Sequence, residues 1–171
     1  MICLYQQQGL DFYELISDIL QKEFKEPVLC AKEFNIPRNS FNPLRNQYDA
    51  SLLIEQTKKI FNKQCDCHLL IVDIDLYSPR FNFIFGLAET QECAAIVSIY
   101  RLAENGLTKE RLAKEVIHEV GHLMGLNHCT IPTCVMYFSQ IIQDTDKKNM
   151  KLCSKCRRKI EKLQTIHSRT N

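Results

Sequence analysis

Hydrophobic and polar residues follow two different periods along the first part of this chain. Apolar residues at helical spacing predict helices over residues 11–24 and 49–61, whereas two prolines among polar residues predict a loop over 35–46. Runs rich in β-branched and aromatic residues predict strands, because such side chains pack well on a pleated surface. The predicted strands are residues 2–7, 28–34, 68–77, 81–85 and 93–102.

The last three predicted strands are expected to lie in one sheet. A further amphipathic helix follows them, with Thr108 as its expected N-cap and with Leu112, Val116, Val120 and Leu123 on its buried side. Helices and strands thus alternate in the first half, and helix and coil make up the second half. This order predicts an α/β sandwich in which helices cover a sheet.

Size and charge narrow the class of protein. A chain of 171 residues without repeats or Gly/Ser-rich linkers is expected to form a single domain, residues 1–171. The net charge of +2 gives no global signal for binding nucleic acid or an anionic membrane. Residues 147–171 carry nine basic side chains and one acidic side chain. We interpret them as a solvated face, with an acidic partner as the alternative.

The N-terminal residues show no secretory signal, and the apolar runs are too short to span a bilayer. A cytoplasmic location is therefore expected. Because thiols stay reduced in that compartment, the nine cysteines are expected to serve as metal ligands more often than as disulfides.

Residues 118–128 read HEVGHLMGLNH and carry the candidate chemistry. His118 and His122 lie one helical turn apart, so both imidazoles can bind one zinc ion. Glu119 lies beside these ligands and can accept a proton from the zinc-bound water. Gly125 can adopt the left-handed conformation that ends a helix, so the chain can return with His128 as third ligand. The fourth zinc position stays open, as catalysis requires.

The alternative for this motif is a set of ordinary histidines on a surface helix. Three of the five histidines fall within eleven residues at the offsets that a zinc site requires, and this argues against that alternative. His68 and His167 match no motif, and we interpret them as incidental.

Four cysteines flank the end of the histidine motif. Cys129 and Cys134 follow it, and Cys153 and Cys156 form a CxxC pair, so together they can complete a four-thiolate structural zinc site. Unrelated buried thiols are the alternative. The remaining cysteines are expected to be unpaired buried or surface thiols: Cys3, Cys30, Cys65, Cys67 and Cys93.

An HExxHxxGxxH motif followed directly by Cys, then CxM and CxxC, resembles the archaemetzincins, a family of metzincin zinc peptidases. The similar segments are residues 73–77, 83–88, 96–101 and 107–156. The resemblance implies a metzincin-like fold, with a mixed twisted sheet, covering helices, an active-site helix, a Met-turn at Met136 and a C-terminal helix. It also implies a catalytic zinc on the three histidines, Glu119 as general base and a second zinc on the four cysteines.

The sequence therefore predicts a zinc metallopeptidase that acts on peptides or proteins as a monomer, with no nucleic acid or membrane as partner. An extended substrate is expected to pair with a strand edge at 83–87 or 96–100. A second hypothesis is a zinc-binding protein with little peptidase activity, in which the metal on Cys129 holds His128 away from the catalytic zinc. A third is a module that binds nucleic acid or an acidic partner. Tyr137 is not expected to take part in catalysis.

Overall fold

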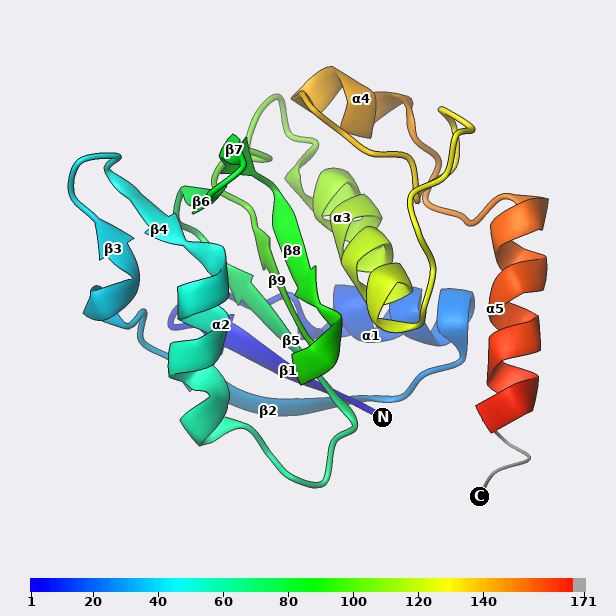
Figure 1. Ribbon diagram of the computed structural model, residues 1–171, viewed down its shortest axis with the longest axis horizontal. Coiled ribbons are helices and arrows are strands. Elements are labelled where there is room, and N and C mark those ends of the chain that lie inside the picture. Colours follow the sequence, from blue (N-terminus) through cyan, green and yellow to red (C-terminus); the bar gives the residue numbers. More distant parts are fainter. Residues whose placement is uncertain (168–171) are drawn as a thin grey trace.

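A five-stranded sheet forms the centre of the molecule, as the computed structural model of residues 1–167 shows (Figure 1). Its strand order is β2-β1-β5-β9-β8, and every neighbouring pair is parallel except β8 with β9. The edge strand β8 therefore has one unpaired side. The strands are β1 (Ile2–Gln7), β2 (Val28–Phe34), β5 (Cys67–Val72), β8 (Gly86–Glu89) and β9 (Ala94–Ser98).

A second, four-stranded sheet lies beside the first, with the order β3-β4-β6-β7. The prediction of one sheet is therefore wrong. The predicted strand 68–77 forms two strands, which are separated by a segment that contains the polar residues Asp73 and Asp75. The second of them, β6, does not continue β5 but pairs in parallel with β4 of the other sheet. The strands are β3 (Phe41–Asn42), β4 (Gln47–Asp49), β6 (Leu76–Ser78) and β7 (Phe81–Ile84).

Helices cover both faces of the large sheet, which confirms the predicted α/β class. The helices α1 (Tyr13–Phe24) and α3 (Thr108–Leu123) pack on one face, and α2 (Ala50–Thr57) packs on the other. Side chains of β1 alternate accordingly, since Ile2 enters the core under α1 and α3 whereas Cys3 enters the core under α2.

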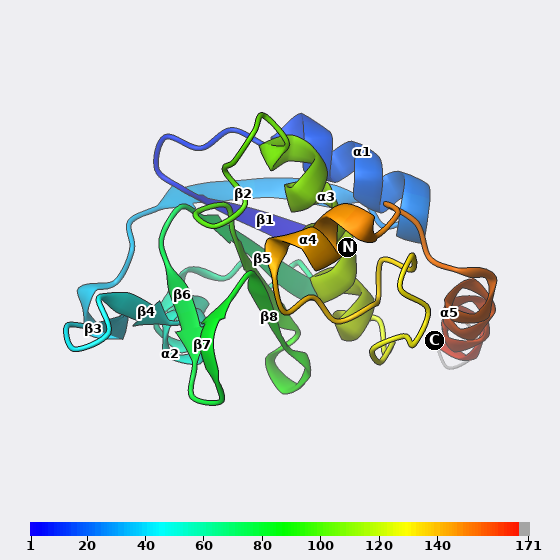
Figure 2. The same cartoon turned by 90° about the horizontal axis from the view of Figure 1, so that it is seen from above.

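Two short segments complete the chain. Helix α4 (Ile142–Lys147) lies near α3, and α5 (Ser154–His167) stands beside the end of α1 at the edge of the molecule (Figure 2). Arg157 of α5 forms an ion pair with Glu23 of α1, and Gln164 donates a hydrogen bond to the backbone oxygen of Phe24. The basic C-terminal run is thus partly helical, and its residues 168–171 lie outside the described chain. Within residues 1–167, no helix combines the length and the apolar character needed to cross a membrane.

Several predicted boundaries shift. The expected loop 35–46 contains a 3₁₀ turn, Arg38–Ser40, before β3, and the expected helix 49–61 ends in a second turn, Lys58–Ile60, after α2. A third turn, Thr90–Glu92, follows β8. Thr108 is not an N-cap but the first residue of α3, because the amide of Arg111 already bonds to the carbonyl of Leu107.

Four cysteines that were expected to be unpaired form two disulfides. Cys3 is bonded to Cys65, and Cys67 to Cys93, with Cα–Cα distances of 5.6 and 4.8 Å. The partners lie 62 and 26 residues apart in sequence, and only the neighbouring positions of β1, β5 and β9 in the sheet bring them together. Cys30 on β2 is free and exposed. The expectation of unpaired thiols is therefore wrong for Cys3, Cys65, Cys67 and Cys93.

Candidate metal centres and the substrate cleft

Helix α3 and the turn after it bring the three predicted histidines together. Their ligand atoms all lie within 4.8 Å of one another. Gly125 has φ +87°, and the amide of Leu126 donates to the carbonyl of Gly121 over 2.9 Å, so a left-handed turn closes the helix as predicted. The chain then returns with His128 facing His118, at 5.2 Å between ring centroids.

The hydrogen bonds of the rings fix their tautomers. Nδ1 of His118 lies 2.8 Å from the carbonyl oxygen of Val135, and Nδ1 of His122 lies 2.8 Å from that of Leu126. Because a carbonyl only accepts, each Nδ1 carries the proton and each Nε2 offers a lone pair. The two Nε2 atoms face each other at 3.1 Å. This arrangement of lone pairs fits two ligands of one cation.

Burial lowers the pKa of all three imidazoles, and the pKa of His118 falls well below its ordinary value. The positive charge of Lys148 adds to this effect for each ring. The neutral form, which binds metal ions, is therefore favoured.

Glu119 lies on the buried side of α3 against the backbone of the edge strand. Glu119 is 6% exposed, and a Cβ atom added at Gly86 would lie 2.8 Å from Oε1 of Glu119. Burial, and then the charge of Glu115, hold the pKa of the Glu119 carboxyl well above its ordinary value, while Lys148 opposes this rise. Only a glycine at position 86 lets β8 approach this carboxyl so closely.

Substituting Gly86 by alanine is therefore expected to lower kcat and to destabilise the chain by about 1–3 kcal/mol. The new Cβ would also lie 2.9 Å from the backbone oxygen of Ile96, which cannot swing away as a side chain can. Zinc content should not change. Peptide hydrolysis, elemental analysis and urea unfolding test this, and the loss of stability should shrink when Glu119 is already alanine. A Gly86→Ala protein with parental activity and stability would contradict the contact.

Met136 lies under the histidine helix, as a Met-turn residue should. It is fully buried, and its sulfur would lie 2.5 Å from a Cβ added at Gly121. The glycine of the motif therefore makes room for the methionine between the turns that carry His118 and His122. Tyr137 is not among the residues that line the cleft, and its amide donates to the carbonyl of Cys134.

A buried ion pair that the sequence did not reveal lies behind Glu119. Nζ of Lys148 is 2.8 Å from the carboxylate of Glu115, and the two side chains are 0% and 4% exposed. The hydroxyl of Thr145 donates to the same carboxylate over 3.0 Å. The signal available in the sequence was weak, because Lys148 sits within a basic run that reads as a solvated face.

Replacing Lys148 by methionine should lower the free energy of unfolding by about 3–5 kcal/mol, because Glu115 would keep a buried charge without its partner. Replacing both, as Glu115→Leu with Lys148→Met, should recover most of this loss. The exposed Lys147 provides the matched control, since Lys147→Met should leave the urea midpoint unchanged. Equal midpoints for the Lys147 and Lys148 variants would refute the argument.

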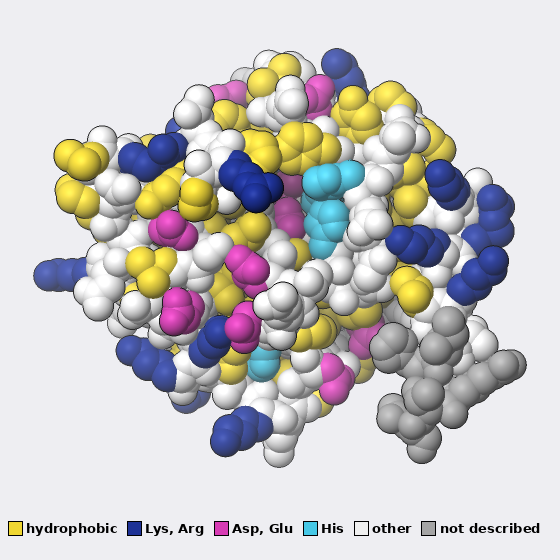
Figure 3. Space-filling view, in the orientation of Figure 1, with side chains coloured by type: hydrophobic (Ala, Val, Ile, Leu, Met, Phe, Trp, Pro, Cys, Tyr) yellow, Lys and Arg dark blue, Asp and Glu magenta, His cyan; other side chains and the backbone are white. Residues whose placement is uncertain are grey.

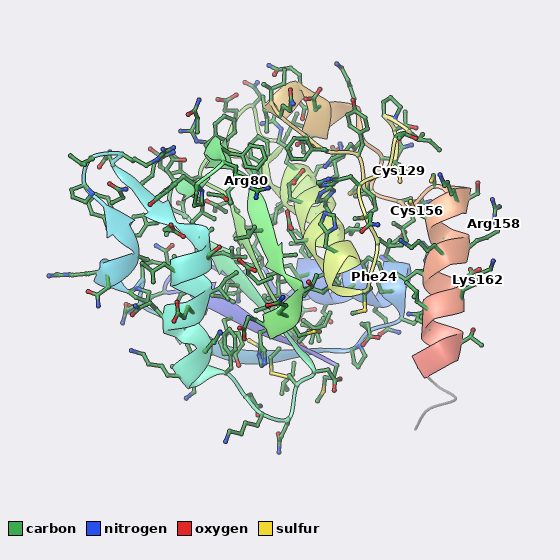
Figure 4. The ribbon with its side chains drawn as sticks, viewed as in Figure 1. Phe24, Arg80, Cys129, Cys156, Arg158 and Lys162 are labelled. Atoms are coloured by element: carbon green, nitrogen blue, oxygen red, sulfur yellow. A yellow bond between two sulfur atoms is a disulfide. The ribbon has the colours of Figure 1, made fainter. Side chains whose placement is uncertain are left out.

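The four predicted cysteines form a second cluster, at the junction of the loop after α3 with the start of α5. Their sulfur atoms all lie within 4.8 Å of one another, with 3.8 Å between Cys129 and Cys153 and 3.9 Å between Cys134 and Cys156. Figure 4 shows Cys129 and Cys156 at this junction.

The thiols of this cluster differ in acidity. Burial raises the pKa of Cys134 and of Cys156. Burial also acts on Cys153, but hydrogen bonds from the backbone of Cys156 and from the neighbouring thiols outweigh it and lower the pKa of Cys153 to about 7. A thiolate at Cys153 is therefore accessible near neutral pH, and thiolates are the form that binds zinc.

A cleft of about 720 Å³ opens in front of the histidines (Figure 3). Its walls come from β7, β8, α3 and residues 138–140. Of the two predicted strand edges, 83–87 overlaps the free edge strand β8, whereas 96–100 overlaps β9, which lies between β5 and β8 and is not an edge. Four aromatic side chains line the cleft: Phe81, Phe83, Phe85 and Phe138.

Comparison with known proteins agrees with these features. Residues 11–162 match peptidase family M54. The archaemetzincin of Pyrococcus horikoshii is 46% identical over 134 residues, which cover 72% of this chain and 70% of that protein. The archaemetzincin of Saccharolobus solfataricus is 37% identical, over 88% of this chain and 85% of that protein.

Solved structures show the same relationship. The crystal structure of archaemetzincin from Methanopyrus kandleri superimposes with a TM-score of 0.87 at 29% identity, covering 96% of this chain and 94% of that chain. A zinc-dependent peptidase from Methanocorpusculum labreanum gives a TM-score of 0.78 at 30% identity, over 94% of this chain and 100% of that chain. The chain thus belongs to peptidase family M54, the family of the archaemetzincins, and is a zinc metallopeptidase.

Proposed function

We propose that this metallopeptidase holds its catalytic zinc through His118, His122 and His128 and uses Glu119 as the general base. The observation that carries the proposal is the approach of two Nε2 lone pairs to 3.1 Å, each fixed by a carbonyl on the opposite side of its ring. When bound, zinc polarises the scissile carbonyl group and makes a water molecule acidic enough to attack near neutral pH.

Glu119 then moves the protons of the reaction. The carboxylate takes a proton from the attacking water, whose oxygen adds to the carbonyl carbon. The C–N bond breaks, and the proton passes to the departing amine, so that one peptide and one water give a carboxylic acid and an amine. The backbone at Gly86 fixes the position of this carboxylate.

The substrate is proposed to bind as an extended strand along β8. The unpaired side of β8 offers backbone donors and acceptors, and several of its residues line the cleft. Pairing there would lay a scissile bond across the mouth of the histidine site.

The four cysteines are proposed to hold a second zinc, which gives two ions per chain with different purposes. Four thiolates leave no open position, so this site is structural and links the segment 129–136 to α5. His128 and Cys129 are consecutive residues, so the structural site also positions the third catalytic ligand. In the alternative, a zinc-binding protein with little peptidase activity, the same adjacency would hold His128 off the catalytic metal.

The proposal extends to a monomer formed by a single domain, residues 1–171, without nucleic acid as partner. A peptide-library digest read by mass spectrometry tests the activity, and zinc analysis of a His128→Ala variant tests the third ligand. Cleavage of library peptides by the parent chain, but not by a variant that lacks the Glu119 carboxylate, supports the peptidase function. A chain that binds both zinc ions but cleaves none of the library favours the alternative. A gel shift at several salt concentrations tests for nucleic acid.

A further inference from the structure

One end of the cleft is closed by an aromatic contact. The ring of Phe138 lies 4.9 Å from the ring of His128 and 5.7 Å from the ring of Phe81, so the segment after Met136 meets β7 beside the histidines. The guanidinium of Arg45 holds β7 in place from behind, because it donates to the carbonyl oxygens of Phe81 and Asn82 over 3.2 and 3.0 Å. A substrate chain running along the cleft would meet this contact as a wall.

The direction of β8 indicates which end of a substrate meets this wall. Strand β8 runs from Gly86, near β7, to Glu89. A peptide that pairs with β8 in the antiparallel sense, the commoner arrangement, runs the opposite way. Its carboxyl-terminal side then points toward the Phe81–Phe138 contact.

Two hydrogen-bond donors without partners among the described residues adjoin this aromatic contact in sequence, since Arg80 precedes Phe81 and Ser139 follows Phe138. Figure 3 shows a basic side chain across the cleft from the histidines, and Figure 4, in the same view, labels Arg80 at that place on the turn between β6 and β7. Arg80 is exposed and has no ion pair or hydrogen bond within the described chain, and its neighbours Ser78 and Phe81 line the cleft. Across from β7, Ser139 lines the cleft with a buried hydroxyl that lacks any partner among the described residues.

The acidic residues of the cleft do not satisfy these donors. Glu119 lies against the backbone at Gly86, and the charge of Glu115 is balanced by Lys148 at 2.8 Å. The nearby Arg101, by contrast, already has a partner, since both its Nε and its Nη2 donate to Asp75. Arg80 is thus the basic group at this end that is free to meet an anion.

We propose that Arg80 and Ser139 bind a carboxylate of the substrate at the closed end of the cleft, so that the enzyme cleaves peptide bonds close to a carboxyl terminus. The inference rests on the proposed peptidase function and on binding along β8. A carboxylate can come from the chain terminus or from an Asp or Glu side chain. The Phe81–Phe138 contact favours the terminus, because it lies in the way of a chain that continues along the cleft.

Matched peptides test this assignment. Fluorescein-Ala-Ala-Phe-Ala is made with a free carboxylate and with a carboxamide, and a third peptide ends in Glu-amide to offer a side-chain carboxylate instead. Binding is measured by fluorescence anisotropy to the zinc-loaded Glu119→Gln protein, and hydrolysis by the parent is followed separately. The variants are Arg80→Gln, Arg80→Lys and Ser139→Ala, with Arg158→Gln on α5 as the control, an exposed arginine far from the cleft (Figure 4).

The free acid is expected to bind about ten-fold more tightly than the amide. A difference of this size is what one pair of charge-assisted hydrogen bonds contributes to affinity. Arg80→Gln should remove this preference without weakening the amide, Arg80→Lys should keep part of it, and Arg158→Gln should keep all of it. Equal binding of acid and amide, or a preference that survives Arg80→Gln, overturns the proposal. Preference for the Glu-amide peptide overturns the assignment to the chain terminus. Because binding is read in a variant that lacks the general base, a failure of hydrolysis alone bears on the peptidase function and not on this site.

Discussion

Replacing Glu119 by glutamine is expected to reduce peptide hydrolysis by about 10²–10⁴-fold while the zinc content stays at the parental value. Glutamine has the same shape as glutamate, so it fits the buried space between α3 and Gly86. Its amide cannot accept the proton of the attacking water. Activity on a library-derived peptide and elemental analysis of the same preparation measure both quantities.

His118→Ala is the matched control for this variant, because it removes a ligand and leaves the general base. It should lose the catalytic zinc together with the activity, whereas Glu119→Gln should lose activity alone. A glutamine variant that cleaves peptides at the parental rate would show that another group takes the proton.

Replacing Cys153 by serine is expected to remove one zinc per chain and to impair folding and catalysis together. The cysteine takes no part in the chemistry, but it links the segment after α3 to α5, and a structural zinc site contributes on the order of 10 kcal/mol of apparent binding free energy. Without it, Cys129 loses its anchor and the adjacent His128 loses its position. Zinc analysis, thermal unfolding and hydrolysis can be measured on one preparation.

Cys30→Ser provides the control, since Cys30 is a free, exposed thiol on β2, away from both clusters. It should keep two zinc ions and full activity. A parent chain with one zinc, or a Cys153→Ser protein as stable and as active as the parent, would refute the structural zinc site.

The sequence predicted which histidines come together, because their arrangement depends on a short segment of the chain. Residues 118–128 lie on one helix and its closing turn, so the spacing of the motif carries nearly all of the geometry. The first two strands and α1 also follow from their hydrophobic period, and β1 and β2 keep their predicted bounds.

Features that depend on distant residues were missed. Cys3 and Cys65 become neighbours only because β1 and β5 pair, and the spacing of the cysteines in the sequence does not predict this pairing. Lys148 looks like part of a solvated basic run until α4 brings it against Glu115. Strand β8 was not predicted, because a glycine such as Gly86 usually marks the end of a strand. In this fold the glycine is needed for the close approach of Glu119 to β8.

The two disulfides and the candidate metal ligands lie in different parts of the chain. Both crosslinks fall within residues 3–93, and each restricts the unfolded chain by about 3–5 kcal/mol in the loop-entropy view. All seven candidate metal ligands lie after them, in residues 118–156. The first half therefore needs an oxidant to form its bonds, whereas the proposed four-thiolate zinc site in the second half needs thiols that stay reduced. With a zinc ion on the four cysteines as proposed, thiol oxidation and metal loading have to take place at different sulfurs of one chain, without exchange between them.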